Sequence, residues 1–142
     1  MTAASSVDDR ELLASYVRQR RDREIDDAAS IGDVSQILTM VFAGMQRRFV
    51  PANAPKKEVV VQWDVAGPDG RVHRWQTVVR PDGCIATTGT PRPPKVTLEL
   101  SLPTFLRLVS GTLGTLRALG TRRLKVRGSP FAAASIERWF GG

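Results

Sequence analysis

The stretch from Val96 to Gly128 decides the fold, and it reads VTLELSLPTFLRLVSGTLGTLRALGTRRLKVRG. Its two ends alternate apolar and polar residues, which is the pattern of a half-buried strand. Between them, Ser101 is placed to cap a helix, and Gly111 and Gly120 each follow an apolar helical run. The stretch therefore predicts, in order, a strand over 96–101, helices over 102–109 and 112–119, and a strand over 123–127.

The residues on either side add a helix, three strands and a closing helix. Asp33 is placed to cap an amphipathic helix whose apolar residues follow three-and-four spacing. Ser129 and Pro130 are the cap and first-turn residues of the closing helix. These elements are a helix over 34–49, strands over 58–65, 72–80 and 84–89, and a helix over 130–140. Together with the central stretch they predict an α+β domain.

The N-terminal segment has a different character. Residues 8–27 are helix-prone, with Asp8 or Asp9 as the N-cap, but their apolar positions are sparse among charged residues. We therefore interpret residues 1–32 as a charged helical extension, a surface arm or partner-binding helix rather than core. Residues 33–142 are predicted to form the domain itself.

The composition is that of a globular protein of one domain, with 142 residues of which 42% are hydrophobic and 25% charged. No segment has the roughly 20 apolar residues of a membrane-spanning helix, and the first residues lack the pattern of a secretory signal. The single cysteine, Cys84, excludes an internal disulfide and fits a reducing compartment. We therefore expect a cytoplasmic protein.

Charge is distributed unevenly along the chain, whose formal net charge is +7. Acidic residues outnumber basic ones over 1–33, whereas no acid occurs between Leu100 and Ile136. The basic residues of that acid-free part are Arg107, Arg117, Arg122, Arg123, Lys125 and Arg127. Such a stretch attracts phosphates or anionic lipid headgroups. Alternatively, its last members form the charged solvent face of an edge strand.

Few residues suit catalysis. His73 is the only histidine and falls in a predicted strand, and Cys84 has no neighbouring base in the sequence. Asp64 and Glu99 are predicted to point away from the helices. No spacing typical of a catalytic motif, a phosphate-binding loop or a metal site occurs. We therefore expect neither an enzyme nor a cofactor nor a metal.

One short motif is also found in RNA-binding domains. Gly111-Thr112-Leu113-Gly114 matches the Gly-x-x-Gly loop of certain RNA-binding domains. Its centre lacks a basic residue and its flanks are apolar, so we interpret it as a tight junction between helices. We expect no nucleic-acid partner.

Over about residues 34–140 the order of elements resembles the sterol carrier protein type-2 family. The resemblance rests on the helix over 34–49, VVVQWDV over 59–65, WQTVV over 75–79 and the turn Pro81-Asp82-Gly83. Its strongest part is VTLELS over 96–101, then Phe105-Leu106, Gly111 and LKVRG over 124–128. Ser129-Pro130 departs from the Gly-Asp that often follows the last strand in the family. The family's peroxisomal targeting tail is absent, which argues against a peroxisomal role.

The resemblance implies a five-stranded mixed sheet with helices over one face and an apolar tunnel between them. It also implies binding, and possible transfer, of a sterol, a fatty acid or a fatty acyl-CoA without catalysis. The candidate tunnel residues are Phe42, Met45, Trp63, Trp75, Phe105, Leu106, Val109, Leu113, Leu116, Phe131 and Phe140. The candidates for headgroup or membrane contact are Arg107, Arg117, Arg122 and Arg123.

Three interpretations stay open from the sequence. The first is a lipid carrier that contacts an anionic membrane surface transiently. The second is an α+β cone enzyme of the polyketide cyclase or steroid isomerase type, which an inward Asp64 or His73 would favour. The third is a basic interaction module in which the N-terminal helix mediates dimerisation and the apolar residues form a dry core.

Overall fold

The sheet has five strands in the order β3-β2-β1-β4-β5. The computed structural model describes residues 6–140. The strands are β1 (Val59–Ala66), β2 (Val72–Arg80), β3 (Gly83–Thr88), β4 (Val96–Ser101) and β5 (Leu124–Gly128). β1 and β4 pair in parallel and the other neighbours are antiparallel, so the sheet is mixed, as predicted.

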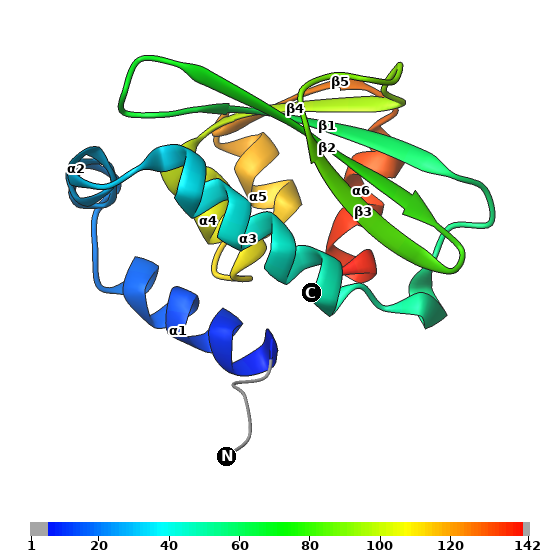
Figure 1. Cartoon of the computed structure of the whole chain (residues 1–142), viewed down its shortest axis with the longest axis horizontal. Helices are drawn as coiled ribbons and strands as arrows, with labels where there is room; N and C mark the ends of the chain where they lie inside the picture. The colour runs from blue at the N-terminus through cyan, green and yellow to red at the C-terminus, as the bar shows by residue number, and fades with distance from the viewer. Residues whose placement is uncertain (1–5, 141–142) are drawn as a thin grey trace.

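The helices lie on one side of the sheet (Figure 1). They are α1 (Ser6–Arg18), α2 (Asp22–Ile31), α3 (Val34–Arg48), α4 (Leu102–Val109), α5 (Thr115–Gly120), α6 (Pro130–Trp139) and the short 3-10 turn η1 (Pro51–Asn53). α3 to α6 form the layer next to the sheet, and α1 lies outside α3 and α4 (Figure 1). The predicted α+β class is therefore confirmed.

Local sequence signals place the helix starts. The side chain of Asp33 accepts a hydrogen bond from Ser35 N at 2.9 Å, and Ser101 accepts one from Thr104 N at 3.3 Å. Ser129 caps α6 in the same way. Each cap satisfies one of the free N–H groups that begin a helix. The predicted starts of α3, α4 and α6 are confirmed.

The strand register separates an apolar face from a polar one. Val61, Trp63 and Val65 alternate with Gln62 and Asp64 along β1, and neighbouring strands keep the same alternation. The first three belong to the hydrophobic core under the helices, whereas the two polar residues lie on the outer face. The helix-covered face is therefore the side on which an apolar site can form.

Two predicted elements were wrong. The helix expected over 112–119 begins only at Thr115, because Gly111 adopts φ +80° and the next residues form a loop. The single surface helix expected over 8–27 is two helices, and Val17 and Ile25 are buried in the core. α1 also begins at Ser6, ahead of both proposed capping aspartates. The division of the chain at residue 32 stays a prediction.

Within residues 6–140, no single helix is both long and apolar enough to span a membrane. α2 and α3 meet the length and composition criteria only as a pair, and they are bent by 111° at the break between them.

Candidate functional site

A cavity of about 390 Å³ lies between the sheet and the helices. Its lining residues are Arg10, Met45, Arg48, Trp63, Leu98, Leu108, Val109, Gly111, Leu113, Gly114, Thr115, Leu124, Ala133, Ile136, Glu137 and Phe140. This volume falls within the range of sites that hold small ligands, about 300–1,000 Å³. Because Gly111 and Gly114 are exposed, the cavity reaches the surface at the loop between α4 and α5.

The apolar walls come from elements far apart in the sequence. Trp63, Leu98 and Leu124 form the floor on the three neighbouring strands β1, β4 and β5. Ile136 of α6 and Phe140, the C-cap of that helix, form part of the opposite wall, together with residues of α3 and α4. All five of these side chains are buried. An apolar chain entering this space would leave water with little loss of hydrogen bonding.

Charged side chains also line the cavity. Arg48 of α3 donates from Nη2 to the carbonyl of Val109 at 3.3 Å, and Arg10 of α1 lies against Gly111. The carboxylate of Glu137 accepts a hydrogen bond from the backbone N–H of Thr115. The cavity therefore combines apolar walls with two guanidinium groups, an arrangement suited to a ligand with an anionic head and an apolar tail.

Five of the predicted tunnel residues line the cavity: Met45, Trp63, Val109, Leu113 and Phe140. Phe42, Trp75, Phe105 and Leu106 are buried but do not line it. Phe42 stacks on Trp75 with ring centroids 4.5 Å apart and packs beside Phe105 at 5.1 Å. These rings fill the neighbouring part of the interior, so that part of the expected tunnel is packed core.

Leu116 and Phe131 are corrections to the predicted tunnel. Their exposed fractions are 77% and 84%, so neither lies inside the protein. Because α5 begins at Thr115, this residue and Ala118 take the inward positions and Leu116 points outward. On α6 the inward positions near the start belong to small alanines, one of which, Ala133, lines the cavity.

The sequence did not single out most of the remaining lining residues. Leu98 and Leu124 could have been found from strand alternation, and Ile136 from helical spacing. Arg10 could not, because the segment that carries it was interpreted as a surface arm. Arg48 lies in the last turn of an amphipathic helix, where a basic residue is commonplace.

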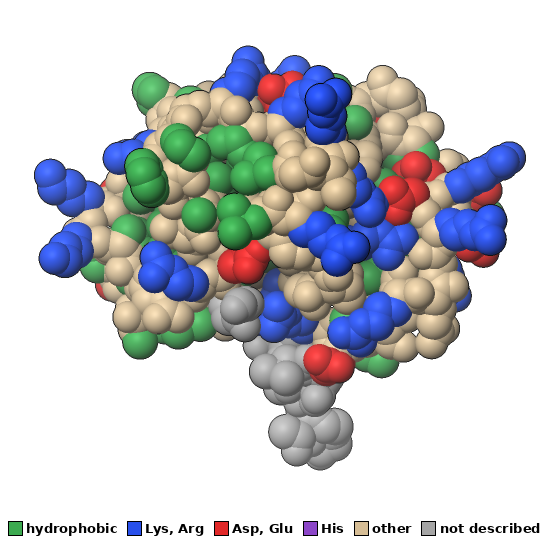
Figure 2. Space-filling model, turned by 180° about the vertical axis from the view of Figure 1, so that it is seen from behind, with side chains coloured by type: hydrophobic (Ala, Val, Ile, Leu, Met, Phe, Trp, Pro, Cys, Tyr) green, Lys and Arg blue, Asp and Glu red, His purple; other side chains and the backbone are tan. Residues whose placement is uncertain are grey.

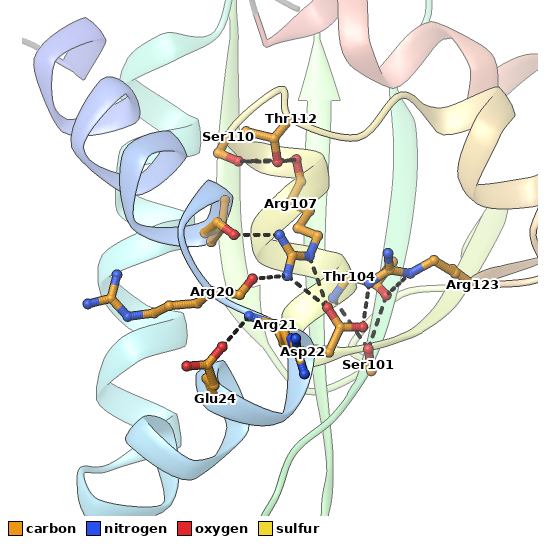
Figure 3. A network of polar contacts seen from close by, with 11 residues as sticks. Arg20, Arg21, Asp22, Glu24, Ser101, Thr104, Arg107, Ser110, Thr112 and Arg123 are labelled. Carbon is orange, nitrogen blue, oxygen red and sulfur yellow. Dashed lines mark hydrogen bonds and ion pairs between the residues drawn. The ribbon is translucent and has the colours of Figure 1, made fainter.

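Two of the four arginines proposed for headgroup contact have partners inside the protein (Figure 3). Arg107 donates from Nε to Asp22 Oδ1 at 2.9 Å and from Nη1 to the carbonyl of Val17 at 2.6 Å. Its Nη2 donates to the carbonyl of Arg20 at 2.8 Å. Arg123 pairs with the other oxygen of Asp22 at 2.6 Å. This network attaches the α1–α2 junction to α4.

Removing the charge of Asp22 tests that attachment. We expect Asp22→Asn to lower the free energy of unfolding by about 1–2 kcal/mol, because hydrogen bonds between charged groups contribute about 1.5–3 kcal/mol and partial exposure reduces this. Urea denaturation measures the change. Asp27→Asn, at an exposed position of the same helix, is the control. Equal effects of the two substitutions would contradict the structural role of Asp22.

The catalytic candidates of the sequence lie outside the cavity. Asp64 is buried on the outer face of the sheet, where Gln62 Nε2 donates to its Oδ1 at 2.9 Å. His73 Nε2 lies 2.9 Å from Asp69 Oδ2 beside the β1–β2 turn. Burial raises the pKa of the Cys84 thiol to about 12, so its reactive thiolate is scarce near neutral pH. Among the side chains described, those of residues 10–140, no group of His, Cys, Asp and Glu could hold a metal ion.

A mixed sheet covered on one face by helices, with an apolar cavity between the layers, defines a class of small α+β ligand-binding domains. The model of the SCP-2 sterol transfer family matches residues 51–141. The chain therefore belongs to this family, whose domains bind and transfer lipids. The comparison with curated proteins finds no match.

Solved structures share the fold. The stereoselective inverting sec-alkylsulfatase Pisa1 from Pseudomonas sp. is 19% identical with a TM-score of 0.59, over 72% of this chain but only 15% of that enzyme. Palmitated SCP2L2 from Aedes aegypti is 21% identical with a TM-score of 0.58, over 72% and 92% of the two chains. Apo sterol carrier protein 2 from Yarrowia lipolytica is 23% identical with a TM-score of 0.50, over 78% and 83%. The fold thus occurs both alone and as part of an enzyme.

Proposed function

We propose that this protein is a non-enzymatic carrier that binds a fatty acid, or a similar lipid with an anionic head, in the cavity. The observation that carries the proposal is the pairing of apolar walls with Arg10 and Arg48 on one lining. Family membership supports lipid binding in general. The palmitated Aedes aegypti protein, which has the same fold, supports a fatty acyl chain as the cargo.

The two arginines favour an acid over a sterol. A sterol offers a single hydroxyl group, whereas a carboxylate forms short charge-assisted hydrogen bonds with guanidinium groups. An apolar ligand group beside Arg48 would offer its guanidinium no hydrogen-bond acceptor, whereas a carboxylate would offer two. In the proposed complex the carboxylate lies near Arg48 and Arg10. The acyl chain lies over Leu98 and Ile136, where burial contributes roughly 25 cal/mol per Å².

The enzymatic alternative depends on Glu137, the carboxylate among the described lining residues. One of its oxygens already accepts the N–H of Thr115 at the start of α5. A role as general acid or base would compete with that bond. We therefore favour a structural role for Glu137 and ligand binding without chemistry.

The substitution Arg48→Gln tests the proposed headgroup contact. We expect it to weaken fatty-acid binding about tenfold, or about 1.4 kcal/mol, and to leave binding of the matching fatty alcohol unchanged. Displacement of a fluorescent fatty acid measures both affinities. Arg47→Gln, at the exposed neighbouring position, is the control. The ratio of the fatty-acid affinity to the fatty-alcohol affinity is the deciding quantity. If this ratio is the same in Arg48→Gln and in the natural protein, Arg48 does not contact the headgroup.

A further inference from the structure

Two large apolar side chains on neighbouring helices are exposed to solvent. Leu116 of α5 is 77% exposed and Phe131 at the start of α6 is 84% exposed, and the two helices contact each other. Figure 2, which shows the molecule from behind, presents hydrophobic side chains gathered on one face with Lys and Arg side chains around them. Exposed apolar groups in such a setting often mark an interaction surface.

The same helices form the cavity wall. Thr115, directly before Leu116, lines the cavity, and so does Ala133, two residues after Phe131. The cavity also includes the exposed Gly114, which is the N-cap of α5. The exposed apolar side chains therefore lie on the outer side of the wall that separates the cavity from solvent.

Most of the charges around these side chains are positive, and the carboxylate of Glu137, which accepts the N–H of Thr115, is the exception. Arg117 and Arg122 are exposed on α5 and on the turn that follows it. No acidic residue occurs between Leu100 and Ile136. Among residues 10–140, no carboxylate pairs with Arg117 or Arg122, in contrast to Arg107 and Arg123. An unneutralised basic surface with apolar side chains fits an anionic partner that also has an apolar interior.

We propose that the α5–α6 face docks on an anionic membrane surface, with Leu116 and Phe131 inserted among the acyl chains and Arg117 and Arg122 among the phosphates. Exposed apolar side chains with arginines beside them fit a fluid, anionic lipid surface, into which the apolar groups insert while the cations stay among the headgroups. Docking through this face brings the cavity wall against the bilayer, where a lipid ligand can enter. The inference deepens the proposed function and rests on it only for the identity of the cargo.

The arginines and the apolar side chains should contribute to membrane partitioning in ways that can be measured separately. Each arginine near an anionic bilayer contributes about a fivefold change in partitioning, which corresponds to about 1 kcal/mol. This part weakens as salt screens the charges over about 8 Å at physiological ionic strength. Inserting apolar side chains contributes a part that salt does not weaken. We expect membrane partitioning through this face to have both a salt-dependent and a salt-independent contribution.

The test is co-flotation with vesicles of phosphatidylcholine containing 30% phosphatidylserine. We expect the variant Leu116→Ser/Phe131→Ser to partition at least tenfold less than the natural chain. The matched control is Ile31→Ser/Met40→Ser, which removes apolar side chains that are 90% and 73% exposed on α2 and α3. A third variant, Arg117→Gln/Arg122→Gln, should lose most of its dependence on phosphatidylserine and on salt.

Equal partitioning of Leu116→Ser/Phe131→Ser and the natural chain would overturn the proposal, and so would equal losses in the test and control variants. Concentration-dependent dimerisation abolished by the same change would instead assign the face to a second copy. Fatty-acid binding in solution, measured without vesicles, should be unchanged in Leu116→Ser/Phe131→Ser. If the natural chain binds vesicles through this face but binds no fatty acid, the docking surface stands and the proposed cargo is wrong.

Discussion

Filling the cavity by the substitution Ala133→Leu is expected to weaken fatty-acid binding at least tenfold. Ala133 is fully buried and lines the cavity from α6, so a larger side chain there must enter the space proposed for the acyl chain. Leucine forms helices almost as well as alanine, so α6 should persist. Because the added carbons enter a cavity, the free energy of unfolding should change by less than the 1–3 kcal/mol typical of overpacking a filled core.

A matched control is available one residue away. Ala134 is exposed on the same helix, so Ala134→Leu adds the same group outside the cavity and should bind fatty acid normally. Fluorescent fatty-acid displacement gives the affinities, and urea denaturation shows that both variants are folded. A folded Ala133→Leu variant with the affinity of the natural protein would mean that the ligand does not occupy this cavity.

Replacing Gly128 by alanine is expected to lower the free energy of unfolding by about 3–5 kcal/mol. Gly128 adopts φ +97°, a conformation that costs other residues about 1–3 kcal/mol. A Cβ there would also overlap the carbonyl oxygen of Lys95 and lie 3.1 Å from Val96 Cα, which are backbone atoms that cannot rotate away. The substitution therefore combines backbone strain with separation of β5 from β4, where Gly128 pairs with Val96.

The substitution Gly70→Ala distinguishes backbone strain from the close approach to β4. The φ of Gly70 is +77°, but nothing lies within 4 Å of a Cβ built there. Gly70→Ala should therefore show the backbone strain alone, about 1–2 kcal/mol. Urea denaturation of both variants gives the comparison. A loss in Gly128→Ala no greater than that in Gly70→Ala would rule out the close approach to β4.

The sequence was sufficient for most of the fold because its signals there are local. The bounds of β2, β4 and α4 follow directly from alternation, from the Ser101 cap and from glycines. Period and capping depend only on residues a few positions apart. The five strands and their order along the chain could therefore be predicted without knowledge of tertiary contacts.

The cavity could be predicted only in part, because its lining depends on helix phase and on distant contacts. A helix start three residues later than expected changed which side of α5 faces inward and exposed Leu116. Arg10 reaches the cavity only because α1 packs against α4, with Val17 buried although a charged run follows it in the sequence. Sparse apolar residues in a charged segment gave no local sign of that packing. A tertiary contact that involves only a few residues leaves no periodic pattern of apolar residues in the sequence.

Native mass spectrometry of delipidated protein titrated with palmitate shows directly whether the cavity binds one anionic lipid. We predict a saturable complex with one palmitate per chain, which forms poorly with hexadecanol and is at least tenfold weaker in Ala133→Leu. The absence of a complex would contradict the binding of an anionic lipid in the cavity. So would adducts that increase without saturation and are equally abundant in Ala133→Leu.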